Sequence, residues 1–279
     1  MNYELIDSGA GRRLERFGKY ILNRPDPEVM WSKNLPEDEW EKADAKFNND
    51  KWETNPNFPE KWQLEINNIT VNLRLTPFKH VGIFPEQIDQ WNQISNSVIQ
   101  LVSNSDQQPH ILNLFGYTGV ASLHALSAGA KVTHLDASRP AITWFKENQE
   151  LSGLSDKPAR IIIDDSLKFT SREIKRGVKY DGVIMDPPVY GHGPNGEKWS
   201  FSKNFPELMD NVSNILIDNP LFVIVNAYAI STSSTSLGNM LIDKLKKFGG
   251  NVTNGELTLK ETSGGRMLST GIWATWQNS

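Results

Sequence analysis

"HILNLFGYTGVASLHALSAGAKVTHLDAS", from His110 to Ser138, decides the fold. It begins with an apolar run of strand length that ends in a glycine turn, residues 115–119. A helical segment that stops at Gly129 follows, and a second apolar run then ends in Asp136. Strand, helix and strand in this order predict a βαβ unit, in which the two strands are parallel neighbours of one sheet.

The same alternation continues on both sides of this unit. Helices are expected over residues 86–102, from the cap Ser138 to about Gly153, in the charged stretch before Tyr180, and over 237–250. Strands are expected in the apolar runs 159–166, 180–188 and 221–229. The last two apolar segments, 254–262 and 269–276, have no helix between them, so they should form an antiparallel hairpin. The sequence therefore predicts an α/β fold, a Rossmann-like, doubly wound, seven-stranded sheet with this hairpin at one edge.

The first eighty residues follow a different pattern. They form short segments broken by turn residues, and residues 69–75 alternate apolar with polar side chains. Several of the nine tryptophans of the chain lie here. We expect a small β-rich module at residues 1–80 and a main domain at residues 81–279.

Composition limits the possible functions. Hydrophobic residues make up 38% and charged residues 22% of the 279 residues, which is ordinary for a globular protein. The formal net charge of −4 means that local basic patches would have to hold any nucleic acid. No run approaches the roughly 20 apolar residues of a membrane span, and the first residues lack the apolar core of a signal peptide, so we expect a cytoplasmic protein without a membrane partner. The absence of cysteine excludes disulfides, thiolate metal sites and a cysteine nucleophile, and we expect no metal site.

Four of the expected strands end in residues that can bind a ligand. In a doubly wound sheet, ligands bind beyond the carboxyl ends of the strands. The glycines of the 115–119 turn let backbone amides approach a ligand at the start of a helix. Asp136 ends the next strand about twenty residues later, the position that binds a ribose in nucleotide-binding folds. Asp164 or Asp165 could accept a hydrogen bond from an adenine amino group, and the fourth strand ends in Asp186-Pro187-Pro188.

Each of these features alone also has a structural explanation. Gly116 and Gly119 can simply form a turn, and Asp136 can help cap the helix that follows it. Asp164 and Asp165 can be a solvated strand end. Because the features occur at successive strand ends of one sheet, together they predict a site for a nucleoside-containing cofactor.

Three stretches resemble the class I S-adenosylmethionine-dependent methyltransferases, and more closely their ribosomal RNA large-subunit group. The stretches are "LNLFGYTGVASLHALSAGA", "HLDASRPAITWFKENQELSG" and "YDGVIMDPPVYGHGPNGEKW". The resemblance extends from about Phe84 to the last residue, and it implies S-adenosyl-L-methionine as the methyl donor. The sheet of that family typically carries one antiparallel strand, which agrees with the expected edge hairpin.

The resemblance implies roles for the residues at the strand ends. Gly116 and Gly119 would bound the methionine pocket, and Asp136 would bind the ribose hydroxyls. Asp165 would face the adenine, with Asp164 as the alternative.

Further cofactor contacts are implied in the same way. Phe84 and Gln87 of "KHVGIFPEQIDQW" would lie near the cofactor. The remaining candidates are neighbours of the residues already named: Asn113, Phe115, Tyr117, Thr118, Ala137, Ser138, Ser166 and Asp186.

"IMDPPVYGHGPNGEKWSF", Ile184 to Phe201, carries the candidate catalytic residues. Methyl transfer from a sulfonium is an in-line displacement, so the acceptor atom must be held close to the methyl carbon. In the similar enzymes that methylate amino groups, the acid or amide and the following proline carbonyl accept hydrogen bonds from the amino group, while an aromatic ring stacks on the extruded base. The resemblance thus implies catalytic roles for Asp186, Pro187, Pro188 and Tyr190, and the prolines fix φ so that the acceptors are preorganised.

The glycine-rich continuation, residues 191–199, is expected to be a mobile flap over the substrate. Trp199 would anchor this flap or contact the substrate. Tyr190 and Trp199 could also be ordinary packed aromatic residues. We expect His192 to be an exposed loop histidine rather than a catalytic base.

The missing cysteines bear on the product. Enzymes that methylate carbon 5 of cytosine first add a thiolate to the ring, as several relatives in this group do. This chain has no cysteine to supply that thiolate. We therefore expect methylation of a nitrogen atom.

RNA, specifically ribosomal RNA, is the expected partner. It is supported by the resemblance, by the amino-terminal module, and by three basic clusters at residues 12–19, 168–179 and 244–247. The last two clusters could equally be solvated helix faces, and the acidic run 36–44 should point away from RNA. Two other functions remain open: a nicotinamide-dependent oxidoreductase, although the glycine spacing G-x-G-x-x-G is absent, and a non-catalytic S-adenosylmethionine-binding protein associated with RNA.

Overall fold

The computed structural model describes residues 2–105 and 107–278, and the chain divides into two compact units. The first unit comprises Met1–Gln87 and Thr258–Thr270, and the second comprises Ile88–Leu257 and Gly271–Ser279. The tip of the carboxyl-terminal hairpin thus belongs to the first unit, whereas the boundary expected from the sequence places it in the main domain.

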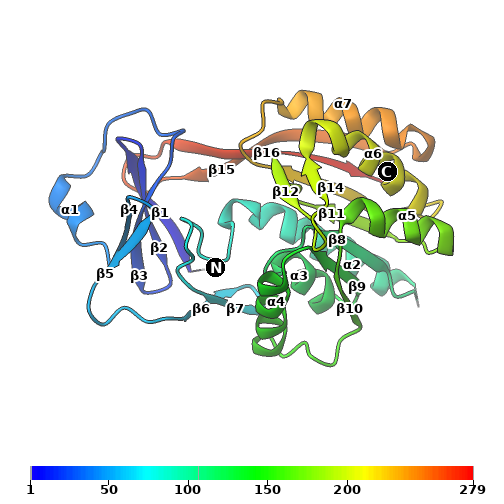
Figure 1. Ribbon diagram of the computed structural model, residues 1–279, viewed down its shortest axis with the longest axis horizontal. Helices are drawn as coiled ribbons and strands as arrows, with labels where there is room; N and C mark the ends of the chain where they lie inside the picture. Colours follow the sequence, from blue (N-terminus) through cyan, green and yellow to red (C-terminus); the bar gives the residue numbers. More distant parts are fainter. Residues whose placement is uncertain (1, 106, 279) are drawn as a thin grey trace. The chain divides into compact units, whose positions relative to one another are not determined.

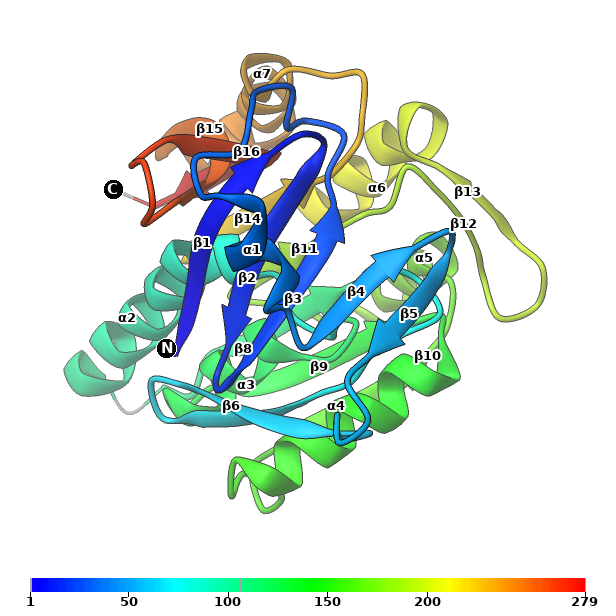
Figure 2. The ribbon, with the colours of Figure 1, turned by 90° about the vertical axis from the view of Figure 1, so that its left-hand side faces the viewer.

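The first unit is rich in β-structure, as the sequence predicts. Its five-stranded sheet has the order β1-β2-β3-β4-β5, and Figure 2 shows these strands side by side. The strands are β1 (Tyr3–Gly9), β2 (Arg12–Phe17), β3 (Tyr20–Pro25), β4 (Ala45–Asn48) and β5 (Lys51–Thr54). The short helix α1 (Glu37–Glu41), the hairpin β6 (Trp62–Ile66) and β7 (Ile69–Leu73), and the 3-10 turn η1 (Pro85–Gln87) complete the unit.

The second unit alternates strands with helices. Its first half contains α2 (Ile88–Asn104), β8 (His110–Leu114), α3 (Val120–Ser127), β9 (Lys131–Asp136), α4 (Arg139–Leu151), β10 (Ala159–Ile163) and α5 (Ser166–Arg176). Its second half contains β11 (Gly182–Met185), β12 (Tyr190–His192), β13 (Lys198–Ser200), α6 (Phe201–Ile215), β14 (Phe222–Ala227), α7 (Ser234–Leu245), η2 (Lys246–Phe248), β15 (Asn251–Lys260) and β16 (Met267–Gln277).

The seven-stranded sheet confirms the predicted fold class. Its order is β10-β9-β8-β11-β14-β16-β15, in which the first five strands are parallel and β16 runs antiparallel to β14 (Figure 1). The hairpin β15–β16 therefore lies at one edge, as expected. No helix in the described part of the chain is long and apolar enough to cross a membrane.

Helices cover both faces of this sheet, with α5, α6 and α7 on one face and α2, α3 and α4 on the other (Figure 1). Alternate residues of the central strands point to opposite faces. Leu112, Val183 and Val223, for example, pack in one core with Leu208 of α6 and Leu241 of α7. All residues of β11 and β14 are buried, which explains why both read as unbroken apolar runs.

Two elements are not anticipated by the sequence. The stretch after the paired prolines, expected to be a loose flap, contains the two-stranded hairpin β12–β13. Helix α6 follows directly and buries Phe205, Leu208 and Val212, with Pro206 inside the helix. The sequence does not indicate the hairpin and the helix because glycines within residues 191–196 and Pro206 usually mark loops.

A buried ionic network holds β1, β2 and β3 of the first unit together. Arg13 and Arg24 lie directly opposite each other on β2 and β3, an arrangement that is unfavourable unless it is neutralised. Glu15, which is fully buried, accepts two hydrogen bonds from Arg24, at 2.7 and 2.8 Å, and one from the Tyr3 hydroxyl at 2.9 Å. The Arg13 Nε atom lies 3.2 Å from a Glu15 oxygen. These arginines thus compensate a buried carboxylate.

Pairing also accounts for most of the basic clusters in which the sequence suggested RNA binding. In the first cluster, Arg13 is buried against Glu15, and Arg16 pairs with Glu4. In the other two clusters, the cations that pair with acids are Lys168 with Glu197, Arg172 with Asp164, Arg176 with Glu173, Lys244 with Asp210 and Lys246 with Asp243. This pairing favours the alternative that the last two clusters are solvated helix faces, and RNA contact by the clusters stays a prediction.

We expect the change Glu15→Gln to lower the free energy of unfolding by about 3–5 kcal/mol, because it removes the carboxylate that both buried guanidiniums share and leaves Arg13 only its longer contact with Asp26, at 3.6 Å. Burial raises the pKa of Glu15, but Arg13 and Arg24 lower it more, so the pKa lies below its ordinary value of 4.5. The stabilisation should therefore be present above about pH 4.5 and be lost as the pH falls through the depressed pKa. Urea unfolding at several pH values measures both effects.

The matched control is Glu4→Gln, which breaks the half-exposed pair of Glu4 with Arg16. This control should cost about 0–1 kcal/mol. Equal losses for the two variants would contradict a structural role for the buried network.

Candidate active site

The carboxyl ends of four neighbouring parallel strands meet at one edge of the sheet. Leu114, the last residue of β8, pairs with Leu135 of β9 and with Met185 of β11, and Ile163 of β10 pairs with Asp136. The 115–119 turn, Asp136, Asp164 and Asp186 follow these positions directly. The structure therefore brings the predicted strand-end residues together.

The turn from Phe115 to Gly119 has a strained backbone. Phe115, Tyr117 and Gly119 have positive φ angles of 56°, 49° and 83°. For a non-glycine residue such an angle costs about 1–3 kcal/mol and is typical of functional sites. The Gly119 amide donates to the Gly116 carbonyl at 2.9 Å, which closes the turn just before α3 begins.

The two glycines of this turn lie against two stacked rings. A Cβ atom at Gly116 would lie 2.3 Å from the His134 ring, and one at Gly119 would lie 2.0 Å from the Phe145 ring. The His134 and Phe145 rings are themselves stacked, with centroids 4.0 Å apart and an interplanar angle of 16°. Both positions must therefore be glycine, because any side chain there would clash with a protein ring. This reason adds to the one that the sequence suggested, the close approach of a ligand.

A chain of buried polar groups fixes the His134 ring. The Asn113 amide donates to the Ser122 Oγ atom at 2.9 Å, and this Oγ atom lies 2.9 Å from His134 Nδ1. Burial lowers the pKa of His134 to about 3, so the ring stays neutral. Asn113 thus serves this network with its side-chain amide, and its contact with the cofactor stays a prediction.

Asp136 connects the turn to the start of α4. Its Oδ2 atom accepts from the Tyr117 amide and its Oδ1 atom from the Ser138 amide, each at 2.8 Å. Ser138 caps α4 by accepting from the Ala141 amide, as expected. Burial raises the pKa of Asp136 above its ordinary value of 3.8, although backbone amides lower it in part. Each oxygen can accept a further hydrogen bond, so this carboxylate suits a ligand that donates from hydroxyl groups.

The acids after β10 have partners within the protein. Asp165 caps α5, because its Oδ1 atom accepts from the Lys168 amide at 2.9 Å. Asp164 accepts from the Asp165 amide and forms an ion pair with Arg172. Ser166, the first residue of α5, is buried. Both acids thus support this corner of the site.

The segment after β11 is anchored rather than loose. The Trp199 indole N–H donates to the Pro188 carbonyl at 2.6 Å, and its ring packs on Phe115 with centroids 4.9 Å apart. Pro187 is buried and Pro188 is exposed. Tyr190 is 76% exposed, so it is not a core aromatic, whereas Trp199 is buried. Trp199 therefore fixes the second proline and the 115–119 turn together.

Comparison with known proteins identifies the family. Residues 90–253 match the family described as Conserved hypothetical protein 95. The structure of the S-adenosylmethionine-dependent methyltransferase from Agrobacterium tumefaciens has 40% sequence identity and a TM-score of 0.96, and the match covers 100% of this chain and 91% of that one. The chain belongs to the Conserved hypothetical protein 95 family. It is an S-adenosylmethionine-dependent methyltransferase.

More distant relatives resemble this methyltransferase over part of their length. The ribosomal RNA large subunit methyltransferase K/L of Shewanella frigidimarina is 32% identical over 156 residues, which cover 55% of this chain and 20% of the relative. The chain thus spans about a fifth of the length of that curated relative. The Pyrococcus abyssi tRNA (uracil-54, C5)-methyltransferase has 12% identity and a TM-score of 0.50 over 98% of this chain and 62% of that one, so it shares the fold.

Family membership decides between a methyltransferase and a nicotinamide-dependent oxidoreductase. A nicotinamide-dependent oxidoreductase is excluded, and S-adenosylmethionine is the cofactor of this methyltransferase. The partly buried Asp136 and the strained 115–119 turn fit a cofactor with ribose hydroxyls and a polar methionine end. Within residues 2–105 and 107–278, no group of three or more histidine, aspartate or glutamate side chains could hold a metal ion.

Some residues of the methyltransferase site lie outside what the sequence motifs indicated. His134, Ser122 and Asn148 support the turn, since Asn148 donates to the Thr118 carbonyl at 3.0 Å. A polar residue inside an apolar strand, as in "KVTHLD", is the signal that could have identified His134. The candidates Phe84 and Gln87 belong to the first unit. Their role near the cofactor stays a prediction.

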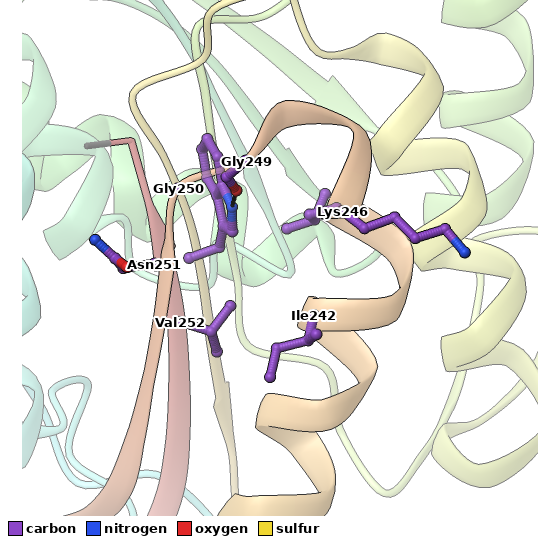
Figure 3. Close-up of a pocket in the computed structure, with 8 residues that line it drawn as sticks. Ile242, Lys246, Gly249, Gly250, Asn251 and Val252 are labelled. Atoms are coloured by element: carbon purple, nitrogen blue, oxygen red, sulfur yellow. Dashed lines mark hydrogen bonds between the residues drawn. The ribbon is translucent and has the colours of Figure 1, made fainter.

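A groove of the methyltransferase lies away from the carboxyl ends of the parallel strands. It has a volume of about 350 Å³, and Ile242 of α7 and Val252 of β15 both line it (Figure 3). Trp276, which also lines it, pairs with Val223 near the start of β14. The groove is therefore at the opposite end of the sheet from the candidate active site.

The contact between Gly119 and Phe145 can be tested with Gly119→Ala. Gly153→Ala is the matched control, because Gly153 also has a positive φ, of 66°, but has open space where a Cβ atom would stand. We expect Gly119→Ala to lower the free energy of unfolding by about 1–3 kcal/mol more than the control, because it overpacks the ring. It should also weaken S-adenosylhomocysteine binding in calorimetry, whereas Gly153→Ala should not. Equal effects in both assays would show that the ring contact does not shape the turn.

Proposed function

We propose that this methyltransferase transfers a methyl group from S-adenosylmethionine to a nitrogen atom of a nucleobase in RNA, specifically ribosomal RNA, in the cytoplasm. The observation that carries the proposal is the adjacency of two strand ends. The Asp186 amide donates to the Leu114 carbonyl at 3.4 Å, so the Asp-Pro-Pro segment begins beside the 115–119 turn. A rigid set of acceptors therefore stands next to the proposed methyl-donor site.

The proposed cofactor contacts follow the strand ends. Asp136 would accept hydrogen bonds from the ribose hydroxyls, and its ionisation would become less costly when two hydroxyl donors reach it. Asp164 and Asp165 would face the adenine, and Gly116 and Gly119 would bound the methionine pocket. The further proposed contacts are Phe84, Gln87, Phe115, Tyr117, Thr118, Ala137, Ser138, Ser166 and Asp186, whereas Asn113 would act through Ser122 and His134.

The acceptor side would hold an amino group in line with the methyl group. When bound, the sulfonium cofactor supplies an electrophilic methyl group. The Asp186 carboxylate and the Pro187 carbonyl would accept hydrogen bonds from the amino group and direct its lone pair, and the Asp186 carboxylate would receive the proton that the nitrogen loses. The Pro188 carbonyl already accepts from Trp199, so Pro187 is the proline better placed for this task. Tyr190, being exposed, would stack on the extruded base.

The choice of nitrogen rests on the chemistry of the acceptor. An exocyclic or ring nitrogen attacks the methyl group with its own lone pair. Carbon 5 of a pyrimidine first needs a covalent nucleophile, and the chain has no cysteine to provide one.

RNA as the substrate is supported by the relatives and by the first unit. The Shewanella relative is named as a ribosomal RNA large subunit methyltransferase. The first unit, with its five-stranded sheet, would contact the RNA around the target nucleotide. Several cations of the basic clusters are paired with acids, so we also look for RNA contacts outside these clusters.

Two measurements test the proposed function. Mass spectrometry of ribosomal RNA nucleosides, from cells with and without the protein, should show the loss of one N-methylated nucleoside. Purified protein should then restore that nucleoside in RNA from the deficient cells. Unchanged nucleosides together with intact S-adenosylhomocysteine binding would favour a non-catalytic RNA-associated protein. A lost 5-methylcytosine would refute nitrogen as the acceptor.

We expect two substitutions to separate cofactor binding from catalysis. Asp136→Ala should weaken S-adenosylhomocysteine binding by about tenfold or more, because a charge-assisted hydrogen bond contributes about 1.5–3 kcal/mol. Asp186→Ala should lower kcat by about a hundredfold or more, as the loss of a positioning and proton-accepting group does, and should reduce turnover more than cofactor affinity. Calorimetry and initial-rate kinetics measure the two effects. Normal turnover by Asp186→Ala would end the proposed role of the acceptor segment.

A further inference from the structure

The β12–β13 hairpin has two chemically different faces. Its strands pair Tyr190 with Ser200, Gly191 with Trp199, and His192 with Lys198. Directly opposite residues share a face of a hairpin, and successive pairs alternate between the faces. Tyr190, His192 and Lys198 therefore lie on one face, which we call the outer face, and Trp199 lies on the other.

The inner face and the tip of the hairpin are anchored to the second unit. Trp199 is only 5% exposed and donates to the Pro188 carbonyl at 2.6 Å. At the tip, Glu197 forms an ion pair with Lys168 of α5 at 2.6 Å. The hydrogen bond from Lys168 is the main reason why the pKa of Glu197 is lowered to about 2. The contacts of Trp199 and Glu197 thus fix the position of the hairpin and of its outer face.

The outer face carries groups that recognise nucleic acid. Tyr190, His192 and Lys198 are all exposed. Within the described residues Lys198 has no ion-pair partner, because its neighbour Glu197 is occupied by Lys168. Aromatic rings stack on unpaired bases, and lysine pairs with phosphate. An exposed lysine beside an exposed aromatic ring favours a single-stranded nucleic acid over a protein partner, since lysine is depleted from protein interfaces.

We propose that the outer face binds the RNA strand that flanks the target base, with Lys198 paired to the phosphate of the adjoining nucleotide. The inference rests on the proposed function, in which Tyr190 stacks on the target base. The pair His192 and Lys198 lies two residues farther along the hairpin, a distance of about 6.8 Å. This distance is about twice the 3.4 Å spacing of stacked nucleotides, so it fits a strand that is unstacked beside an extruded base.

The experiment uses the full chain and a fluorescein-labelled single-stranded ribosomal RNA fragment that the wild-type protein methylates. Fluorescence anisotropy measures the RNA affinity over a range of salt concentrations. Lys198→Gln should weaken binding at low salt and reduce the slope of log K against log salt by about 0.7, the contribution of one phosphate contact in a single strand. His192→Ala should weaken binding with little change of slope. The control is Lys131→Gln, which removes an exposed lysine at the start of β9, at the end of the sheet away from the candidate site, and should change neither quantity.

The outcomes separate this inference from the proposed function. If the wild-type protein binds and methylates the RNA while Lys198→Gln matches it in affinity and slope, the outer-face inference is wrong and the proposed function stands. Equal losses for Lys198→Gln and Lys131→Gln would also overturn it, because they indicate diffuse charge. If no ribosomal RNA is bound or methylated by the wild-type protein, the proposed function fails, and this inference fails with it. S-adenosylhomocysteine affinity should be unchanged in all variants, which verifies that the cofactor site is intact.

Discussion

The stacked rings of His134 and Phe145 are the support on which the candidate active site depends. They fill the space where side chains at positions 116 and 119 would otherwise stand, so the turn can lie flat only if both residues are glycine. The rings come from β9 and α4, whereas the turn joins β8 to α3. The stacked rings thus contact a region in which four consecutive elements of the chain meet: β8, α3, β9 and α4. The positive φ angles of Phe115 and Tyr117 persist because this packing, together with the bond from Tyr117 to Asp136, outweighs their strain.

The sequence predicted the sheet and the strand ends well because both depend on local signals. Apolar runs, glycine stops and the cap at Ser138 are each readable within a few residues. Parallel pairing then placed Asp136 and Asp186 at the same edge as the glycine turn without further information. The structure adds a reason for the glycines that no local pattern contains, since Phe145 is 26 residues away from Gly119 in the chain.

Charge was the least predictable property, because an ion pair depends on which distant residue lies opposite. Lys168 and Glu197 are separated by 28 intervening residues and meet only because the hairpin folds onto α5. Arg13 resembled part of a basic surface until the register of β2 and β3 placed it, with Arg24, beside Glu15. The hairpin itself was hidden by glycines that the sequence associates with mobility. A run of basic residues therefore indicates a binding surface only after the acids that face it are known.

Trp199 links the acceptor segment to the cofactor turn through two different contacts. Its indole N–H holds the Pro188 carbonyl, while its ring packs on Phe115, the first residue of the turn. If RNA binds the outer face of the hairpin, any displacement of the hairpin must move Trp199, and with it Pro188 and Phe115. The position of the target base and the shape of the methionine pocket would then be set by the same side chain. Such a linkage would use the binding energy of RNA contacts outside the reacting atoms to align the acceptor with the methyl group. Catalysis by positioning depends on binding energy of this kind.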